Sequence, residues 1–171
     1  MNLLELVQAQ LSEARLDQLA SIVTESGAAR ELLAPRVLAR LIQLLDVAET
    51  DTVLDIACAT GYSTAILARM ARTVTALDDD PAMVERARAA LADLGIINAT
   101  VVKGPLQEGA AAEGPFDAIL VNGAVHDVPP ALLDQLKDGG RLVAIRQEGS
   151  VGRATVWRRM AMRYDSRAAH D

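Results

Sequence analysis

The stretch "VLDIACATGYSTAIL", residues 53–67, decides the fold of this chain. An apolar run that contains Asp55 ends in a short turn, and a helical pattern follows the turn. A turn of this kind binds the phosphate or carboxylate of a nucleotide-like cofactor, because the N-terminus of the following helix attracts anions. These turns normally contain several glycines. Here Ala57 and Ala59 take two of the expected glycine positions, and only Gly61 remains.

Strands and helices alternate downstream of this turn. Short apolar runs predict strands, and the segments between them carry helix signals such as the Asp80-Pro81 N-cap. We expect strands at 52–57, 73–78, 99–104, 116–122 and 141–147, and helices at 62–70, 81–94 and 130–137. The tail at 154–164 has no helix before it and should return as an antiparallel strand. This pattern predicts an α/β fold, a doubly wound and mostly parallel sheet with an antiparallel last strand and helices on both faces.

The segment before the turn is predicted to be helical. Apolar residues fall on one side of a helix at 3–25, and a second helix begins at Pro35. With 171 residues, we expect a single domain, with an N-terminal helical region at 1–50 and a cofactor-binding α/β core at 51–171. The N-terminal helix also offers a surface for a homodimer.

The composition excludes several classes of function. The net charge of −6 and the scarcity of aromatic residues argue against a nucleic-acid partner. Cys58 is the only cysteine, which rules out an internal disulfide and a multi-cysteine metal site. No apolar run approaches the length of a membrane span, so we expect no membrane partner and a cytoplasmic location.

An acid at the end of the second strand supports a nucleoside cofactor. Asp78 lies 23 residues after Asp55, where a carboxylate can accept hydrogen bonds from both ribose hydroxyls. The turn fits a dinucleotide fingerprint poorly, and it has no Lys-Ser/Thr pair to make a phosphate-binding P-loop. A nicotinamide-dependent oxidoreductase is therefore disfavoured.

The spacing D-x-A-x-A-x-G instead resembles the D/E-x-G-x-G-x-G turn of S-adenosylmethionine-dependent methyltransferases. From about Leu32 to the C-terminus the chain resembles the protein-L-isoaspartate O-methyltransferase family, particularly its short bacterial members. The resemblance covers about four-fifths of the chain. It rests on "LLAPRVLARLIQLLDV", "VLDIACATGYSTAILA", "VTALDDDP", "FDAILVNGAV" and "VPPALLDQLKDGGRLVAI".

This resemblance implies S-adenosylmethionine as the cofactor and assigns residues to it. The turn and its surroundings would enclose the methionine end, the second strand would hold the ribose, and the segment after the third strand would flank the adenine. In that order the implied residues are Asp55, Ala57, Ala59, Gly61 and Tyr62; Asp78 with Asp79; Gly104, Pro105 and Leu106; and Asn122 as the floor.

The chain also departs from the family pattern. Pro105 stands where members have an acid for the adenine amino group, and Leu33 stands where they have a hydroxyl residue that reads the isoaspartyl group. Leucine cannot hydrogen-bond a carboxylate, so we expect little or no methylation of isoaspartyl peptides, unless Ser26 or Arg30 supplies the donor. The acceptor, a protein or a small molecule, is left open.

The alanines leave two functions open. If the backbone angle φ is positive at Ala57 or Ala59, each methyl group costs about 1 kcal/mol or more. The chain is then either a methyltransferase with a weakened cofactor loop or a catalytically inactive binding or regulatory module. His126, after the fourth strand, is a candidate base, although an exposed loop histidine without a role is the more common case.

Overall fold

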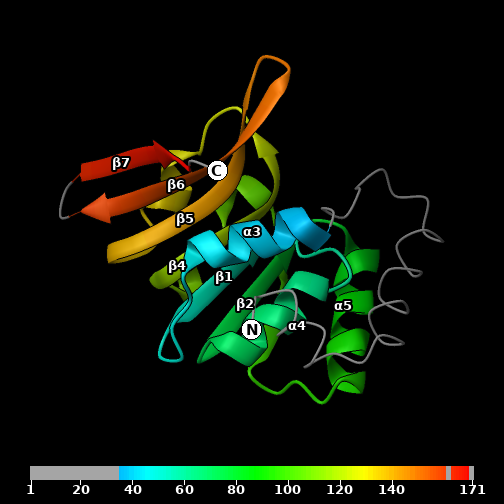
Figure 1. Cartoon of the computed structure of the whole chain (residues 1–171). Coiled ribbons are helices and arrows are strands. Elements are labelled where there is room, and N and C mark those ends of the chain that lie inside the picture. The colour runs from blue at the N-terminus through cyan, green and yellow to red at the C-terminus, as the bar shows by residue number, and fades with distance from the viewer. Residues whose placement is uncertain (1–34, 161–162, 170–171) are drawn as a thin grey trace.

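The computed structural model describes residues 35–160 and 163–169, which form a seven-stranded sheet with helices packed against it (Figure 1). The predicted helix at 3–25, and Ser26, Arg30 and Leu33, lie outside the described residues. The elements in chain order are α3 Pro35–Leu45, β1 Thr52–Ile56, α4 Tyr62–Met70, β2 Thr73–Asp78, α5 Pro81–Asp93, β3 Ala99–Lys103, the 3₁₀ turns η1 Leu106–Glu108 and η2 Ala111–Glu113, β4 Phe116–Val125, α6 Pro130–Leu133, β5 Leu136–Glu148, β6 Val151–Met160 and β7 Arg163–Ala168.

The sheet has the strand order β3-β2-β1-β4-β5-β6-β7. Strands β1 to β5 are parallel, β6 is antiparallel to β5, and β7 is antiparallel to β6. The predicted α/β class, with a mostly parallel sheet and an antiparallel last strand, is therefore confirmed. The chain fills one side of β1 with β2 and β3 and then crosses to β4 on the other side. Ligands bind at such a switch point, beyond the carboxyl ends of the strands.

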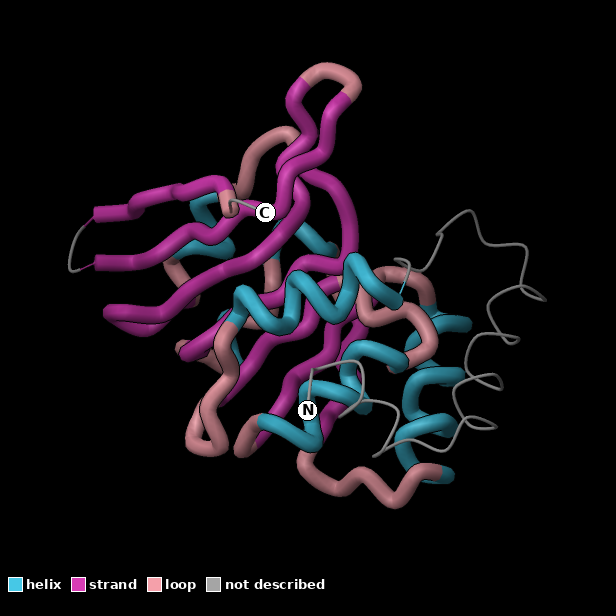
Figure 2. Tube along the Cα trace, viewed as in Figure 1, coloured by secondary structure: helices cyan, strands magenta, loops and turns pink. Residues whose placement is uncertain are grey.

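Two apolar layers sandwich the sheet. The longer helices α3, α4 and α5 pack on one face, where Leu41 and Val53 are fully buried. The short helix α6 packs on the other face, over Phe116 and Trp157. Figure 2 shows α3 lying across the sheet, with α4 and α5 towards the β2–β3 side. The longest described helix, α5, has 13 residues, and no described helix is long and apolar enough to cross a membrane.

The local signals around the cofactor turn fold as predicted. Strand β1, helix α4 and strand β2 lie at the expected positions, and α5 begins at Pro81 after Asp80, whose side chain accepts a hydrogen bond from Ala82 N at 2.9 Å. Gly95 ends this segment with φ 69°.

Two boundaries in the second half of the chain were predicted wrongly. The helix expected at 130–137 ends at Leu133, because Leu136 instead pairs with Phe116 of β4 and is fully buried. Strand β5 therefore starts earlier than 141. The pairing of β4 with β5 shifts register between Phe116 and Ala118, and a Cβ on Gly140 in this part of β5 would lie 2.8 Å from Lys137 O.

The C-terminal tail also differs from the prediction. A single strand was expected at 154–164, whereas the chain reverses and forms β6 and β7. Their pairing brings Met160 opposite Arg163, with Arg158 opposite Asp165. The sequence offers no recognised turn signal at this reversal, and the pairing of β7 depends on the neighbouring strand β6.

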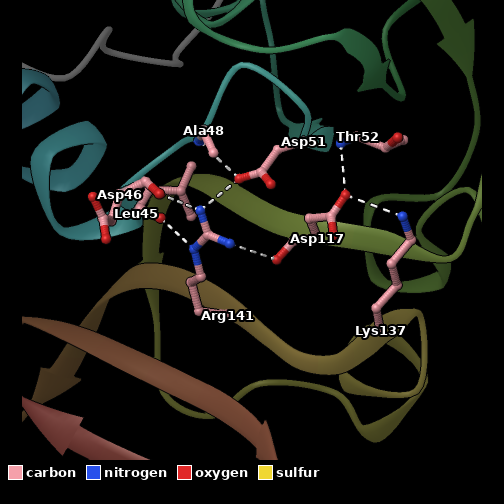
Figure 3. A network of polar contacts seen from close by, with 8 residues as sticks. All are labelled: Leu45, Asp46, Ala48, Asp51, Thr52, Asp117, Lys137 and Arg141. Atoms are coloured by element: carbon pink, nitrogen blue, oxygen red, sulfur yellow. Dashed lines mark hydrogen bonds and ion pairs between the residues drawn. The ribbon is translucent and has the colours of Figure 1, made fainter.

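Arg141 holds the helical layer to the sheet at the end opposite the cofactor turn (Figure 3). Its guanidinium donates to Asp51 Oδ2 at 2.7 Å, to Asp117 O at 3.2 Å, and to the carbonyls of Leu45 and Asp46 at the end of α3. The side chains of Arg141 and Asp51 are 13% and 10% exposed. Arg141 thus supplies donors to the carbonyls that α3 leaves unpaired at its C-terminus.

Candidate active site

The turn between β1 and α4 adopts a left-handed backbone at each position where the family motif has glycine. The angle φ is 63° at Ala57, 48° at Ala59 and 89° at Gly61. A Cβ on Gly61 would make an ordinary contact with that of Ala87 in α5, at 3.4 Å, so the backbone angle rather than space favours glycine there. The structure thus answers the question that the sequence left open: both alanines occupy a conformation that costs an L-residue about 1–2 kcal/mol.

Backbone hydrogen bonds fix the turn to strand β2. The N–H groups of Ala57 and Cys58 both donate to Leu77 O, at 2.8 and 3.1 Å. Ala59 N donates to Asp78 Oδ2 at 2.9 Å, and Gly61 N donates to Cys58 O at 2.9 Å. The turn has the shape of a cofactor loop despite its alanines.

Asp55 braces this turn from behind. Its carboxylate is fully buried and accepts hydrogen bonds from Ser63 Oγ and Thr64 Oγ1, both at 2.7 Å, and from Asn122 Nδ2 at 2.6 Å. Burial raises the pKa of Asp55 from 3.8 to about 6, against the lowering effect of the three hydrogen bonds. Asp55 thus joins β1, the start of α4 and β4, and its carboxylate does not reach the surface.

Asp78 is also enclosed. Its side chain is fully buried; Oδ2 accepts from Ala59 N, and Oδ1 accepts from Asp80 N at 3.0 Å. Asp79, beside it, is exposed. These two backbone bonds orient the Asp78 carboxylate against the turn.

A cavity of about 680 Å³ opens beside the turn, at the carboxyl ends of β1 and β4. Five of the predicted site residues line it: Ala57, Ala59, Tyr62, Leu106 and Asn122. The other predicted residues, Asp55, Gly61, Asp78, Asp79, Gly104 and Pro105, are not among the lining residues. Three of the five residues predicted for the methionine end, Ala57, Ala59 and Tyr62, therefore line the cavity, together with Leu106 from the predicted adenine wall and Asn122 from the predicted floor.

Sequence reasoning missed much of the far wall of the cavity. This wall runs from Gly123 through Pro129, with Leu132 of α6, Gln107 of η1 and Leu38 of α3. The wall begins within the last part of β4. This strand ends at Val125, three residues beyond the end at 122 that the sequence predicted. Ser63 and Thr64 were also missed, although two hydroxyl residues at the start of the helix were visible in the sequence.

The lining suits a nucleoside cofactor with an amino-acid end. Tyr62 and Ser63, in the first turn of α4, face the cavity, where unpaired helix N–H groups favour a carboxylate. Ile56 and Leu106 add apolar surface suited to a purine. Within the described residues, no group of three His, Cys, Asp or Glu side chains lies close enough to hold a metal ion.

Two further residues of the sequence analysis lie at the cavity. Cys58 is buried in the turn, where its Sγ donates to Ala59 O at 3.8 Å. His126 lines the outer part and is exposed, as expected for a loop histidine after β4. Asp127, beside it, is exposed and accepts from Val128 N at 2.9 Å, so its carboxylate closes its own turn.

The sheet order and the position of the cavity define the fold of the S-adenosylmethionine-dependent methyltransferases. A solved protein-L-isoaspartate O-methyltransferase superposes with a TM-score of 0.76 over 84% of this chain and 47% of its own, at 23% identity. A Plasmodium falciparum structure assigned to the same family, in complex with S-adenosyl-L-homocysteine, gives 0.70 over 99% of this chain and 93% of its own, at 18% identity.

The chain belongs to the protein-L-isoaspartate(D-aspartate) O-methyltransferase family, whose model matches residues 9–163. The Koribacter versatilis protein-L-isoaspartate O-methyltransferase is 40% identical over 109 residues, which are 64% of this chain and 49% of the relative. The chain spans about half the length of the curated relatives it matches. The resemblance found in the sequence is therefore confirmed.

Proposed function

We propose that this protein is an S-adenosylmethionine-dependent methyltransferase. The observation that carries the proposal is the left-handed turn between β1 and α4, fixed to Leu77 and Asp78 and open to a cavity of about 680 Å³. Family membership supports the same function. When bound, S-adenosylmethionine would supply an electrophilic methyl group on sulfur.

The chain's own residues would act mainly by positioning. Methyl transfer requires the nucleophile, methyl group and sulfur to lie in line, and holding two reactants in that geometry lowers the barrier substantially. Asn122 lines the cavity and donates to Asp55 Oδ1 and to Ile56 O, which fixes the end of β4 against the turn. Tyr62 and Ser63 would hold the amino-acid end of the cofactor, and Asp78 the ribose.

The acceptor that we propose is a protein or small molecule rather than a nucleic acid, which the net charge of −6 supports. A cytoplasmic location belongs to the same proposal and is supported by the single cysteine, with which the chain cannot form an internal disulfide. A homodimer stays a prediction, which light scattering of the full chain tests.

Calorimetric titration with S-adenosylhomocysteine, with NAD as the control ligand, tests cofactor binding. We expect binding of the former and none of NAD; the reverse result would refute the proposal. A radiolabelled methyl-transfer assay on isoaspartyl and aspartyl peptides then tests activity, and we expect little turnover of either. Binding without transfer to any acceptor in a broad peptide and metabolite panel would instead favour the inactive binding module.

A further inference from the structure

The side-chain amide of Asn122 lines the cavity near the end of β4, beside the cofactor turn. Its Nδ2 atom donates to Asp55 Oδ1 at 2.6 Å, to Ile56 O at 3.2 Å and to Ser63 Oγ at 3.1 Å. A backbone carbonyl oxygen can only accept, so the end of the amide that faces Ile56 must be its NH₂ group. The three partners therefore fix the orientation of the amide and direct its oxygen, Oδ1, away from them.

The oxygen of this amide is an acceptor that the described part of the chain does not use. Within residues 35–160 and 163–169, the side chain of Asn122 makes no further hydrogen bond. Thr60 Oγ1 is the only fully enclosed side-chain polar atom of these residues that lacks a partner, so Asn122 Oδ1 is not enclosed. Because Asn122 is half-buried and lines the cavity, Oδ1 presents its lone pairs to a molecule bound there.

The side chains around the cavity disfavour an anionic acceptor. No lysine or arginine is among the described residues that line it, whereas the carboxyl group of Asp127 belongs to the wall that follows Asn122. Much of the remaining lining is apolar and includes Leu38, Val125 and Leu132. Moving a carboxylate into such surroundings without a cation to pair with it is costly. An uncharged group that donates a hydrogen bond instead matches the free oxygen of Asn122.

We propose that the methyl acceptor is an uncharged N–H or O–H nucleophile and that it donates a hydrogen bond to Asn122 Oδ1. This inference rests on the proposed methyltransferase function and adds to it a substrate class and a residue that touches the acceptor. The hydrogen bond fixes the acceptor atom while leaving its lone pair free for the methyl group, which is the alignment that methyl transfer requires.

The transfer balances without a further reactant. The lone pair of the acceptor nitrogen or oxygen forms a bond to the methyl carbon, the carbon–sulfur bond breaks, and its electron pair stays on sulfur. The acceptor atom gains positive charge, and its proton then passes to solvent water on the side of the cavity where His126 is exposed. Asn122 Oδ1 is oriented before the reaction, so it stabilises the developing positive charge without reorganising.

Calorimetric titration of the full chain, saturated with S-adenosylhomocysteine, tests this hydrogen bond. The probes are aniline and phenol, which donate a hydrogen bond, toluene, which cannot, and benzoate, which is an anion. We expect aniline or phenol to bind about three- to tenfold tighter than toluene, the range of one neutral hydrogen bond. The tighter of the two tells a nitrogen acceptor from an oxygen acceptor. Benzoate should bind more weakly than both.

Asn122→Leu removes the free oxygen. Because it also removes a donor from Asp55, the measured quantity is the ratio of the affinities for the donor probe and toluene, which should fall to about one. Asn98→Leu is the matched control. Asn98 Nδ2 also donates to three oxygens, those of Ala68, Ala71 and Arg72, but Asn98 does not line the cavity. This variant should keep the wild-type ratio. An unchanged ratio in Asn122→Leu refutes the role of Asn122.

The outcomes separate this inference from the proposed function. If the wild type binds no S-adenosylhomocysteine, the proposed function fails, and the same probes without cofactor still test Asn122. If it binds S-adenosylhomocysteine but binds aniline and phenol no tighter than toluene, the inference is overturned and the proposed function stands. Benzoate as the tightest probe also overturns the inference, in favour of a carboxylate acceptor. The absence of binding by every probe overturns it as well.

Discussion

Replacing Ala57 by glycine should relieve strain in the cofactor turn rather than weaken the protein. At φ 63° the alanine pays about 1–2 kcal/mol relative to a relaxed backbone. Glycine also lowers the free energy of unfolding by about 0.4–1 kcal/mol, because the unfolded chain gains conformational freedom. The methyl group is only half-buried, so its loss costs less than the about 0.8 kcal/mol of a fully buried one. At the middle of each range these effects leave a net gain of about 0.4 kcal/mol.

Ala89→Gly is the matched control for this substitution. Ala89 is exposed in the interior of α5, where glycine costs about 1 kcal/mol in a helix. For a chain of this size, that loss lowers the melting temperature by about 2–4 °C. Urea and thermal unfolding should thus separate the two variants by about 1–2 kcal/mol, with Ala57→Gly the more stable.

Cofactor affinity gives a second reading of the same substitution. Ala57 and Ala59 both line the cavity, so removing both methyl groups should also widen it beside the turn. We expect the double glycine variant to bind S-adenosylhomocysteine about tenfold tighter or more, as 1.4 kcal/mol corresponds to a factor of ten. If Ala57→Gly destabilised the protein as much as Ala89→Gly does, the strain argument would be wrong. Unchanged affinity of the double variant would show that the turn already accommodates the methyl groups.

Three further predictions follow from buried polar groups. The unfolding free energy should fall by up to about 3 kcal/mol as pH rises from about 4 to above 6. The reason is that the pKa of Asp55 is higher in the folded state than its ordinary value, so the protonated carboxyl group favours the folded form. Asp55→Asn should therefore flatten this part of the pH profile measured by urea unfolding. Asp78→Ala should weaken S-adenosylhomocysteine binding by about 1.5–3 kcal/mol in calorimetry, and equal affinity would sink the ribose assignment. Arg141→Met should destabilise the protein by about 3 kcal/mol, because it leaves the Asp51 carboxylate without its cation and the α3 carbonyls without their donors. Lys137→Met, at a more exposed pair, should cost less than about 1 kcal/mol in the same assay.

The parts of the fold that sequence predicted well are those with local causes. The Asp80-Pro81 start of α5 and the apolar run of β1 each depend on residues close together in the chain. The end of α6 could not be found in this way, because Leu136 leaves the helical pattern in order to pair with Phe116, 20 residues away. Pairing with β4 and burial of Leu136 outweigh the local preference for a helix.

The site was predicted unevenly for the same reason. The residue types of the turn implied a cofactor loop, yet neither the sign of φ at Ala57 and Ala59 nor the neighbours of Asp55 can be read from the sequence. Asn122 reaches Asp55 across 67 positions, and the pair is brought together only by the adjacency of β1 and β4. The acid of the motif consequently has a different immediate role from the one implied by the resemblance: it organises the turn and does not line the cavity.

The balance of these interactions explains how the turn keeps its shape with two alanines. Strain at both positions amounts to about 2–4 kcal/mol. Against it stand three hydrogen bonds made by the N–H groups of the turn: two to Leu77 O and one to Asp78. At about 0.5–1.5 kcal/mol net for each bond, they contribute about 1.5–4.5 kcal/mol. The hydrogen bonds therefore offset the strain, and the missing glycines alter the room beside the cofactor more than the conformation of the loop.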